Sequence, residues 1–446
     1  MIATATVVDR NPLDTWAAGR IGTGNNLLTR AALADYQLTA IRQTIEWVRR
    51  NSAFYAAQLG AFPPDWPRTL QEFELAPLTT PADIVDCAHT FLCVPQSEIS
   101  RVVTLETSGT TGMRKRIFFT AADQDLALDF FAHAVSAIAT CDDRMFIALP
   151  GEREGSVGFQ LARGVERAGV QPIPHGLIFD PAAALECIDR ERATLLIGLP
   201  VQVLALALET GDLARRAFRR LHTVVLCSDH VPRSLANTIR RATGCEIFEH
   251  YGSTEMGLGG GIDCRAHAGY HLREADLYFE IVSPRTGEPL PDGQLGEVVF
   301  TTLGRTGMPL IRYRTGDLAS FVTGPCSCGS SLRRLTRIES RIDSAVALGP
   351  AGSIDISVLD DALFAIPSIH DFAATFVAGD PHELQIKIYA PHESEALAGQ
   401  AKRSLSSLPA IAKNLRAGKL RLSVFQRREP FQATGAKRKI GVQNKS

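Results

Sequence analysis

Residues 222–253, HTVVLCSDHVPRSLANTIRRATGCEIFEHYGS, contain two short apolar runs separated by one helix-like stretch. The runs HTVVLCSD (222–229) and CEIFEHYGS (245–253) predict buried strands, and PRSLANTIRRATG (232–244) predicts the helix between them. The same alternation precedes them in RMFIALP (144–150), GFQLARGVERAG (158–169), VQPIP (170–174) and ATLLIGLP (193–200). Such alternation predicts an α/β fold with layered, mostly parallel sheets and helices. We expect the chemistry to lie at the carboxyl ends of these strands.

The pattern changes twice further along the chain. From residue 277, LYFEIVSP and EVVFTTL alternate in polarity and are joined by the Pro/Gly-rich RTGEPLPDGQLG, which predicts a β hairpin. After Arg341 a strand–helix pattern restarts and predicts a small α+β unit. We therefore expect a large N-terminal domain over residues 1–340, with a β-rich subdomain at about 262–335, and a mobile C-terminal domain over residues 341–446.

Composition limits the class of protein. The 446 residues include 47 Lys+Arg and 48 Asp+Glu, and the net charge of -1 argues against a nucleic-acid or anionic-membrane binder, which needs a basic excess. No run of about 18 apolar residues predicts a transmembrane helix, and the N-terminal MIATATVVDRNPLDTW does not resemble a secretory signal. Nine cysteines without that signal indicate reduced thiols or metal ligands rather than disulfides. We expect a soluble, cytoplasmic protein.

One polar stretch is suited to binding phosphate. TSGTTGMRK (107–115) directly follows the apolar run RVVTL. Its glycines permit tight backbone turns, its hydroxyl and N–H groups can surround phosphate oxygens, and Lys115 adds a positive charge. The stretch is not a Walker A loop, which has a different spacing of glycines and lysine. A Ser/Thr/Gly run also occurs as a surface turn, so the residues alone leave both interpretations open.

TSGTTGMRK resembles the phosphate-binding loop of the adenylate-forming (ANL) superfamily, which includes acyl-CoA synthetases, carrier-protein adenylation domains and luciferases. EHYGSTEMG (249–257) and RYRTGDLA (312–319) are similar to two further segments of these enzymes, in the same order. NSAFYAAQL, APLTTPADI and MPLIRYRTGDL most resemble the phenylacetate–CoA ligase branch. The resemblance covers nearly the whole chain. It implies an ATP-dependent acid–thiol ligase, which forms an acyl-adenylate from a carboxylic acid and transfers the acyl group to coenzyme A.

The resemblance also implies how ATP is held. Lys115 and the loop before it would bind the phosphates, Tyr251 would flank the adenine, and Asp317 would accept hydrogen bonds from the ribose hydroxyls. The alternative is that Tyr251 fills the core and Asp317 lies in a solvated turn. The nucleotide-binding residues implied in this way are Thr107, Ser108, Gly109, Thr110, Thr111, Gly112, Tyr251, Gly252, Ser253, Asp317 and Arg341.

The resemblance assigns the chemistry to a few side chains. Glu255 would be the Mg²⁺ ligand, because a metal must screen the phosphate charge while the substrate carboxylate attacks. A lysine near the C-terminus would neutralise charge in the transition state. The catalytic residues implied are Lys437, Glu255, Thr254 and Lys115.

This chain departs from its relatives at two places. Relatives have the catalytic lysine immediately after a glycine, whereas GAKRK (435–439) places it one residue later. Lys437 is therefore the first candidate and Lys439 the second, with a solvated basic tail as the alternative. The hinge of relatives reads Gly-Arg-x-Asp-Asp, whereas SRIDS (340–344) keeps Arg341 and Asp343 but replaces the first glycine.

Cysteine and histidine residues on both sides of the β-rich region predict a structural zinc site. Cys264, His271, Cys326 and Cys328 would form a Cys₃His set, which is a common closed zinc site. Similar positions in the phenylacetate–CoA ligase branch support it. His267 is a less favoured substitute for His271, and reduced buried thiols with a surface histidine are the alternative.

The identity of the acid is open. Gly158, His230 and His250 are candidate substrate residues, because they lie near strand ends, although each histidine also fits a packing role. The resemblance favours an aryl or arylacetic acid, but PGEREGSVGF (150–159) carries three charged residues, which leaves a polar, hydroxy or branched acid open.

An adenylating enzyme with another acyl acceptor, such as a carrier protein, is the first alternative function. An inactive nucleotide-binding protein is the second. Expected ligands are ATP or AMP, Mg²⁺, coenzyme A and a carboxylic acid. No nucleic acid and no membrane are expected, and a homodimer is left open.

Overall fold

The computed structural model describes residues 11–23, 28–106, 114–349, 352–390, 395–427 and 437–444. The chain forms two compact units. The first comprises Met1–Cys141, Arg163–Val170 and His250–Ile338, and the second comprises Asp142–Ala162, Gln171–Glu249 and Glu339–Ser446. No described helix combines the length and the apolar character that crossing a membrane requires.

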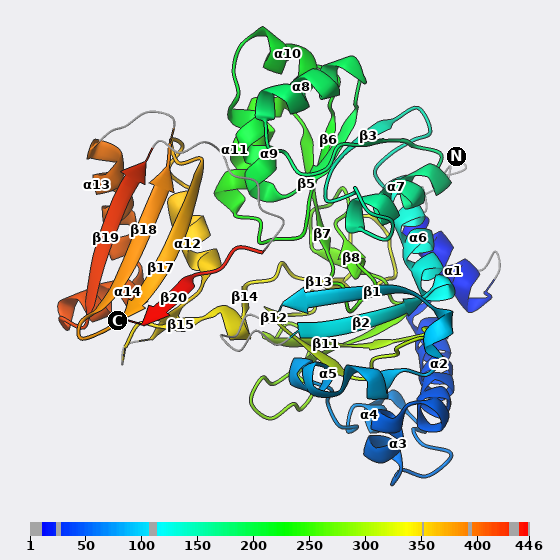
Figure 1. Ribbon diagram of the computed structural model, residues 1–446. Helices are drawn as coiled ribbons and strands as arrows, with labels where there is room; N and C mark the ends of the chain where they lie inside the picture. Colours follow the sequence, from blue (N-terminus) through cyan, green and yellow to red (C-terminus); the bar gives the residue numbers. More distant parts are fainter. Residues whose placement is uncertain are drawn as a thin grey trace, which may run out of the picture. The chain divides into compact units, whose positions relative to one another are not determined.

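The helices of the first unit come mainly from its N-terminal part. They are α1 (Pro12–Ile21), α2 (Arg30–Asn51), α3 (Ala53–Leu59), α4 (Leu70–Phe73), α5 (Pro81–Cys87) and α6 (Ala121–Ser136), and Figure 1 draws them in blue and cyan. All six have a side-chain cap at the N-terminus, because Ser, Thr or Asn precedes the first helical residue.

The cap of α6 also fixes a distant loop. The Thr120 hydroxyl accepts a hydrogen bond from the Asp123 amide, and the Asp123 carboxylate accepts one from the Thr120 amide. The same carboxylate accepts the amides of Thr306 (2.7 Å) and Gly307 (3.0 Å). A Cβ atom on Gly307 would lie 2.7 Å from Asp123 Oδ2, so the loop approaches this closely only because position 307 has no side chain. One carboxylate therefore fixes the start of α6 and the loop after β11 together.

The strands of the first unit are antiparallel. Their core contains the aromatic residues Phe279, Phe300 and Tyr313. The pairing of β10 with β11 places Leu277 opposite Thr302 and confirms the predicted hairpin. Further antiparallel pairs are β1–β2, β11–β12, β8–β9 and β9–β13, and His250 and Tyr251 pair with Ile262 and Gly261. The bounds are β1 (Ile99–Glu106), β2 (Arg114–Thr120), β8 (Gly261–Ile262), β9 (Tyr270–Leu272), β10 (Leu277–Val282), β11 (Gly296–Thr302), β12 (Tyr313–Ala319) and β13 (Arg334–Leu335).

The second unit contains the predicted parallel sheet, drawn in green in Figure 1. Its strands lie in the order β4-β3-β5-β6-β7, and each neighbouring pair is parallel. Every strand predicted between residues 144 and 253 is present, and each predicted run extends past the observed strand into the adjoining loop. The bounds are β3 (Arg144–Ala148), β4 (Gln171–Pro174), β5 (Leu195–Gly198), β6 (Thr223–Leu226) and β7 (Glu246–Tyr251), and the end of β7, from His250, belongs to the first unit.

Helices connect these parallel strands, as the sequence pattern predicts. The helices expected at 158–169 and 232–244 are α7 (Val157–Arg167), whose residues are divided between the units, and α11 (Arg233–Thr243). The others are α8 (Pro181–Arg190), α9 (Pro200–Leu208) and α10 (Asp212–Phe218). The α/β fold class is therefore confirmed.

The C-terminal part of the second unit is a mixed sheet with helices, drawn in orange and red in Figure 1. The strand order is β19-β18-β17-β20, in which only the β17–β18 pair is antiparallel. One apolar cluster joins this part to the parallel sheet within the second unit. The elements are β14 (Ser340–Arg341), β15 (Val346–Ala347), β16 (Ser353–Ile354), α12 (Ile356–Leu363), β17 (Asp371–Ala378), β18 (His382–Tyr389), α13 (Glu395–Ser406), α14 (Pro409–Arg416), β19 (Leu420–Arg427) and β20 (Gly441–Asn444).

The predicted domain boundary stays a prediction. The chain passes from the first unit to the second between Ile338 and Glu339, close to the expected boundary at residue 341. However, the second unit also contains residues 142–162 and 171–249, which the prediction placed in the N-terminal domain.

A buried ion pair provides a test of the first unit. The Arg312 guanidinium donates to the Glu280 carboxylate at 2.8 to 3.1 Å, and both side chains are at most 3% exposed. Burial raises the pKa of Glu280 to about 7, against the opposing effect of Arg312. We expect Glu280→Gln to lower the free energy of unfolding by about 3 kcal/mol at pH 8.5, because it leaves a buried charge unpaired.

Urea unfolding followed by tryptophan fluorescence measures this effect, because the three tryptophans, Trp16, Trp47 and Trp66, all lie in the first unit. The control is Glu46→Gln, which breaks an exposed ion pair with Arg50 and is expected to cost less than about 1 kcal/mol. Equal losses for the two variants would contradict the prediction.

Candidate functional site

The side chains of two predicted residues, Lys115 and Glu255, meet a third side chain, Tyr313, in the first unit. Lys115 lies in β2, Glu255 lies in the turn after β7, and Tyr313 begins β12. Lys115 and Glu255 form an ion pair in which their side chains are 13% and 9% exposed. The Tyr313 hydroxyl accepts from Lys115 Nζ at 3.0 Å and donates to Glu255 Oε1 at 3.3 Å. The resemblance predicted the first two residues, whereas Tyr313 was not singled out.

The Glu255 carboxyl is ionised despite its burial. Burial raises its pKa, but the Lys115 ammonium and the hydrogen bonds from Lys115, the backbone and Ser253 outweigh that effect and lower the pKa to about 2. The cluster therefore presents a carboxylate and an ammonium side by side. A carboxylate oxygen is a suitable ligand for Mg²⁺, which commonly takes one or two carboxylates together with substrate phosphates. The ammonium is suited to phosphate oxygens.

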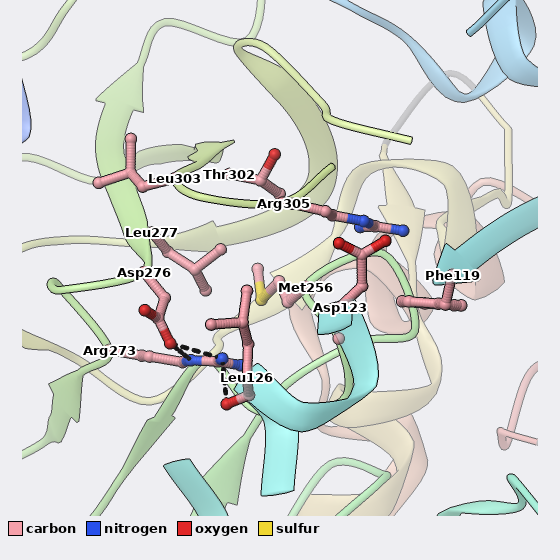
Figure 2. Close-up of a pocket in the computed structure, with 11 residues that line it drawn as sticks. Phe119, Asp123, Leu126, Met256, Arg273, Asp276, Leu277, Thr302, Leu303 and Arg305 are labelled. Atoms are coloured by element: carbon pink, nitrogen blue, oxygen red, sulfur yellow. Dashed lines mark hydrogen bonds and ion pairs between the residues drawn. The ribbon is translucent and has the colours of Figure 1, made fainter. Parts of the chain in front are cut away.

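Arg305 supports this cluster from behind and was not predicted. Its guanidinium donates to the Glu255 carbonyl at 2.7 Å and to the Phe118 carbonyl at 3.2 Å, and it lies 4.4 Å from the centre of the Phe119 ring. Burial lowers the pKa of Arg305 to about 10. Figure 2 shows Arg305 beside Asp123 and Phe119 in a small pocket. Arg305 thus connects the backbone of Glu255 to the strand that carries Lys115.

The residues predicted to bind adenosine also lie together. The Tyr251 hydroxyl donates to Asp317 Oδ2 at 2.9 Å, and both residues are 6% exposed. The Tyr251 ring stacks on Tyr270, with centroids 5.9 Å apart. A Cβ atom on Gly252 would lie 2.0 Å from the Leu258 carbonyl oxygen, so this turn requires glycine. The direct Tyr251–Asp317 contact could not be read from the two separate motifs.

The turn after β7 is held by its own backbone. The Leu258 amide donates to the Ser253 carbonyl at 2.8 Å, and the Gly257 amide donates to the Thr254 carbonyl at 3.0 Å. Ser253 and Thr254 are half-buried, and the Ser253 hydroxyl accepts a hydrogen bond from the Met256 amide at 3.4 Å. The predicted loop residues Thr107, Ser108, Gly109, Thr110, Thr111 and Gly112 lie outside the described residues.

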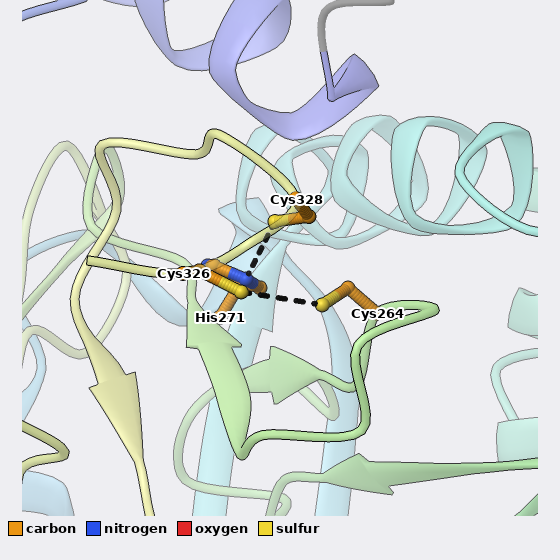
Figure 3. Close-up of side chains that lie close together, drawn as sticks. All are labelled: Cys264, His271, Cys326 and Cys328. Carbon is orange, nitrogen blue, oxygen red and sulfur yellow. Dashed lines mark hydrogen bonds between the residues drawn. The ribbon is translucent and has the colours of Figure 1, made fainter.

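The four predicted metal ligands come together (Figure 3). The ligand atoms of Cys264, His271, Cys326 and Cys328 all lie within 4.8 Å of one another. The sulfurs of Cys264 and Cys326 are 3.7 Å apart, and the Cys328 sulfur lies 3.3 Å from His271 Nε2. Two thiolates bound to one tetrahedral zinc at about 2.3 Å would be about 3.8 Å apart, so the spacing fits. His267 instead contacts Asp263 Oδ2 at 2.7 Å and lies outside the cluster.

Histidine chemistry also fits a ligand role at His271. The side chain is fully buried, and burial lowers its pKa to about 4. A neutral imidazole is the form that binds zinc.

His250, a predicted substrate residue in the first unit, is likewise neutral, because burial lowers its pKa to about 4. Its Nε2 has no hydrogen-bond partner among the residues that the structure describes.

The other predicted residues lie in the second unit. Gly158 donates to the Pro150 carbonyl at 2.7 Å, and a Cβ there would lie 2.6 Å from the Leu149 carbonyl oxygen. The His230 amide donates to Asp229 at 2.9 Å. Arg341 lies in β14 and is half-buried, while Lys437 and Lys439 are exposed.

The ion pair at Glu255 predicts a pH dependence. A carboxyl whose folded pKa, about 2, lies below its unfolded value of 4.5 stabilises the fold above pH 4.5 and loses that contribution as the pH falls toward 2. Between pH 7 and pH 3 we expect the wild-type first unit to lose about 2 kcal/mol more than Glu255→Gln. Urea unfolding at a series of pH values measures the difference. Parallel pH profiles for the two proteins would contradict it.

Known proteins resemble both the sequence and the fold of this chain. A family model described as AMP-binding enzyme matches residues 94–306. Phenylacetate-coenzyme A ligase from Thermus thermophilus is 27% identical over 360 residues, which cover 77% of each chain. The enzyme of the same name from Pseudomonas putida is 28% identical over 329 residues, which cover 71% of this chain and 72% of that one.

A solved structure shows the same fold over most of its length. The 2-hydroxyisobutyryl-CoA ligase in the postadenylation state, in complex with 2-HIB-AMP, aligns with a TM-score of 0.76 at 20% identity. The alignment covers 94% of this chain and 90% of that one. Together with the three sequence motifs and the geometry around Glu255 and Tyr251, these findings confirm the resemblance. The matched family model and the phenylacetate-coenzyme A ligase relatives support the predicted place of this chain in the adenylate-forming superfamily, on the phenylacetate–CoA ligase-like branch.

Proposed function

We propose that the protein is an ATP-dependent acid–thiol ligase, which forms an acyl-adenylate from a carboxylic acid and transfers the acyl group to coenzyme A. The Lys115–Glu255–Tyr313 cluster is the observation that carries this proposal, because it combines a phosphate-binding cation with an ionised carboxylate. The curated relatives, which are named as coenzyme A ligases, support the same reaction.

In the first step the acid carboxylate attacks the α-phosphorus of ATP, and the bond to pyrophosphate breaks. Lys115 binds phosphate oxygens, and Asp317 with Tyr251 holds the nucleoside. Glu255 would hold Mg²⁺, which would screen the phosphate charge. Thr254 and Ser253 lie in the same turn and add hydroxyl groups next to the carboxylate. Catalysis in this step is mostly alignment and charge neutralisation.

Lys437 supplies a further positive charge at the α-phosphate, with Lys439 as the second candidate. In the second step the coenzyme A thiol attacks the acyl carbonyl and AMP leaves. Between the steps, residues 341–446 rotate about the SRIDS segment (340–344) and move the lysine away from the α-phosphate.

Arg341 binds the nucleotide, and Gly158, His230 and His250 contact the acid. A cytoplasmic location and a homodimer stay predictions.

An aryl or arylacetic acid is the proposed substrate class. The polar alternative was based on Glu152, Arg153 and Glu154, and all three side chains are exposed in the second unit. Exposed charges are solvated and give no preference for a polar acid. Two of the curated relatives are named as phenylacetate ligases, which favours the aromatic class.

The experiment is pyrophosphate release from MgATP with a panel of acids headed by phenylacetate, with and without coenzyme A. We expect acid-dependent release that becomes multi-turnover only with coenzyme A. Lys437→Ala should slow it about 100-fold, because a transition-state charge is lost. The control, Lys402→Ala, changes an exposed lysine of α13 and should leave the rate unchanged.

The same assay distinguishes the alternatives. A larger loss for Lys439→Ala than for Lys437→Ala would assign the catalytic role to Lys439. Release that stops at about one turnover with coenzyme A would indicate another acceptor, such as a carrier protein. Binding of ATP without release for any acid would contradict the ligase and favour an inactive nucleotide-binding protein.

A structural zinc ion at Cys264, His271, Cys326 and Cys328 is the second proposal. The four ligand atoms lie within 4.8 Å of one another, and zinc would tie the turn before β9 to the segment before β13. We expect about one zinc per chain by elemental analysis and a loss of most of it in Cys264→Ser. Cys141→Ser, at an exposed cysteine outside the cluster, should retain the metal. Equal zinc content in the two variants, or none in the wild type after incubation with zinc, would contradict the site.

A further inference from the structure

Arg438 is buried although it lies in the basic C-terminal segment. Its side chain is 16% exposed, and its guanidinium donates to Asp360 Oδ1 at 3.2 Å and to the Phe372 carbonyl at 3.2 Å. It also forms an ion pair with Asp371. The guanidinium carbon lies 4.4 Å from the centre of the Phe372 ring, a cation–π distance. Arg438 is therefore packed against other residues, whereas Lys437 and Lys439 on either side of it are exposed.

The backbone of the same residue has a second attachment. The Arg438 amide donates to Asp229 Oδ2 at 3.1 Å. The other oxygen of Asp229 accepts the His230 amide at 2.9 Å. One carboxylate in the loop after β6 thus connects the C-terminal segment to a residue proposed to contact the acid. All of these residues lie in the second unit.

Lys437 lies next to this carboxylate. Burial raises the pKa of Asp229, and the charges of Arg438 and Lys437 oppose that effect. Burial also raises the pKa of Asp360, to about 8, and the charge of Arg438 opposes that effect.

We propose that Arg438 is a positioning residue for adenylation, which holds the backbone of Lys437 in place through its ion pairs with Asp360 and Asp371 and its amide hydrogen bond to Asp229. This inference rests on the proposed function. A lysine that acts on the transition state must be placed accurately, because a displacement of about 1 Å can cost about 100-fold in rate. The anchor also gives a physical reason why the lysine at position 437, one residue later than in relatives, remains useful.

The test separates the two half-reactions and uses phenylacetate as the probe acid. Arg438→Gln removes the ion pairs and keeps a polar side chain. Arg438→Lys keeps the positive charge but lacks the planar guanidinium group with its several N–H donors. We expect Arg438→Gln to lower kcat for pyrophosphate release about 10- to 100-fold with little change in KM for ATP. Thioester formation from supplied phenylacetyl-adenylate and coenzyme A should not change. Arg438→Lys should recover part of the loss.

A double-variant cycle tests whether Arg438 acts through Lys437. In the Lys437→Ala background, Arg438→Gln should cause no further loss of pyrophosphate release, because the group that it positions is already absent. Equal losses in the two half-reactions, or additive losses in the cycle, would show a general structural role and overturn the proposal.

Hydrogen–deuterium exchange provides a readout that needs no substrate. The peptide over residues 437–444 should be protected in the wild type and exchange at least about tenfold faster in Arg438→Gln and Asp229→Ala, while β17 and β18 stay protected. Unchanged exchange would overturn the anchor even if the enzyme is active. If no acid supports pyrophosphate release, the proposed function fails, and the exchange result alone decides whether the anchor exists.

Discussion

The Glu255 carboxylate lies almost out of contact with water, and the neighbouring Lys115 ammonium is what keeps it charged there. Without that cation, burial would favour a neutral carboxyl, which is a poor ligand for a divalent metal. Tyr313 bridges the two charges, and Arg305 holds the backbone of Glu255 against the strand that carries Lys115. Lys115 is in β2, Glu255 follows β7 and Tyr313 begins β12. The cluster of these three side chains can therefore form only when three distant segments of the chain are packed together.

Local patterns in the sequence predicted the elements well. Each run that was predicted as a strand between residues 144 and 253 contains one, because a short buried run flanked by turn residues has few other stable conformations. The alternating hairpin from residue 277 was predicted for the same reason. The residues within motifs, such as Glu255 and Asp317, were predicted through the family resemblance. The four metal ligands were predicted from residue type and position, although the C-x-C spacing alone was weak support.

Contacts between distant segments could not be predicted. Arg305 and Arg438 have no local pattern that separates a buried arginine from an exposed one, because an arginine is buried only when carboxylates or carbonyls from elsewhere in the chain meet it. Tyr313 resembles an ordinary strand aromatic until its hydroxyl is seen between Lys115 and Glu255. The grouping of residues 142–249 with the C-terminal part, apart from Arg163–Val170, depends on long-range packing that composition does not record.

The close approach of Gly307 to Asp123 has a consequence for how this sequence can change over evolutionary time. A side chain at position 307 would collide with the carboxylate that starts α6, and a longer acid at position 123 would collide with the backbone at 307. A change at either position is therefore tolerated only if the other changes to make room. Arg305 lies in the same loop as Gly307. In homologues, positions 123 and 307 should therefore vary as a correlated pair, although they are far apart in the chain.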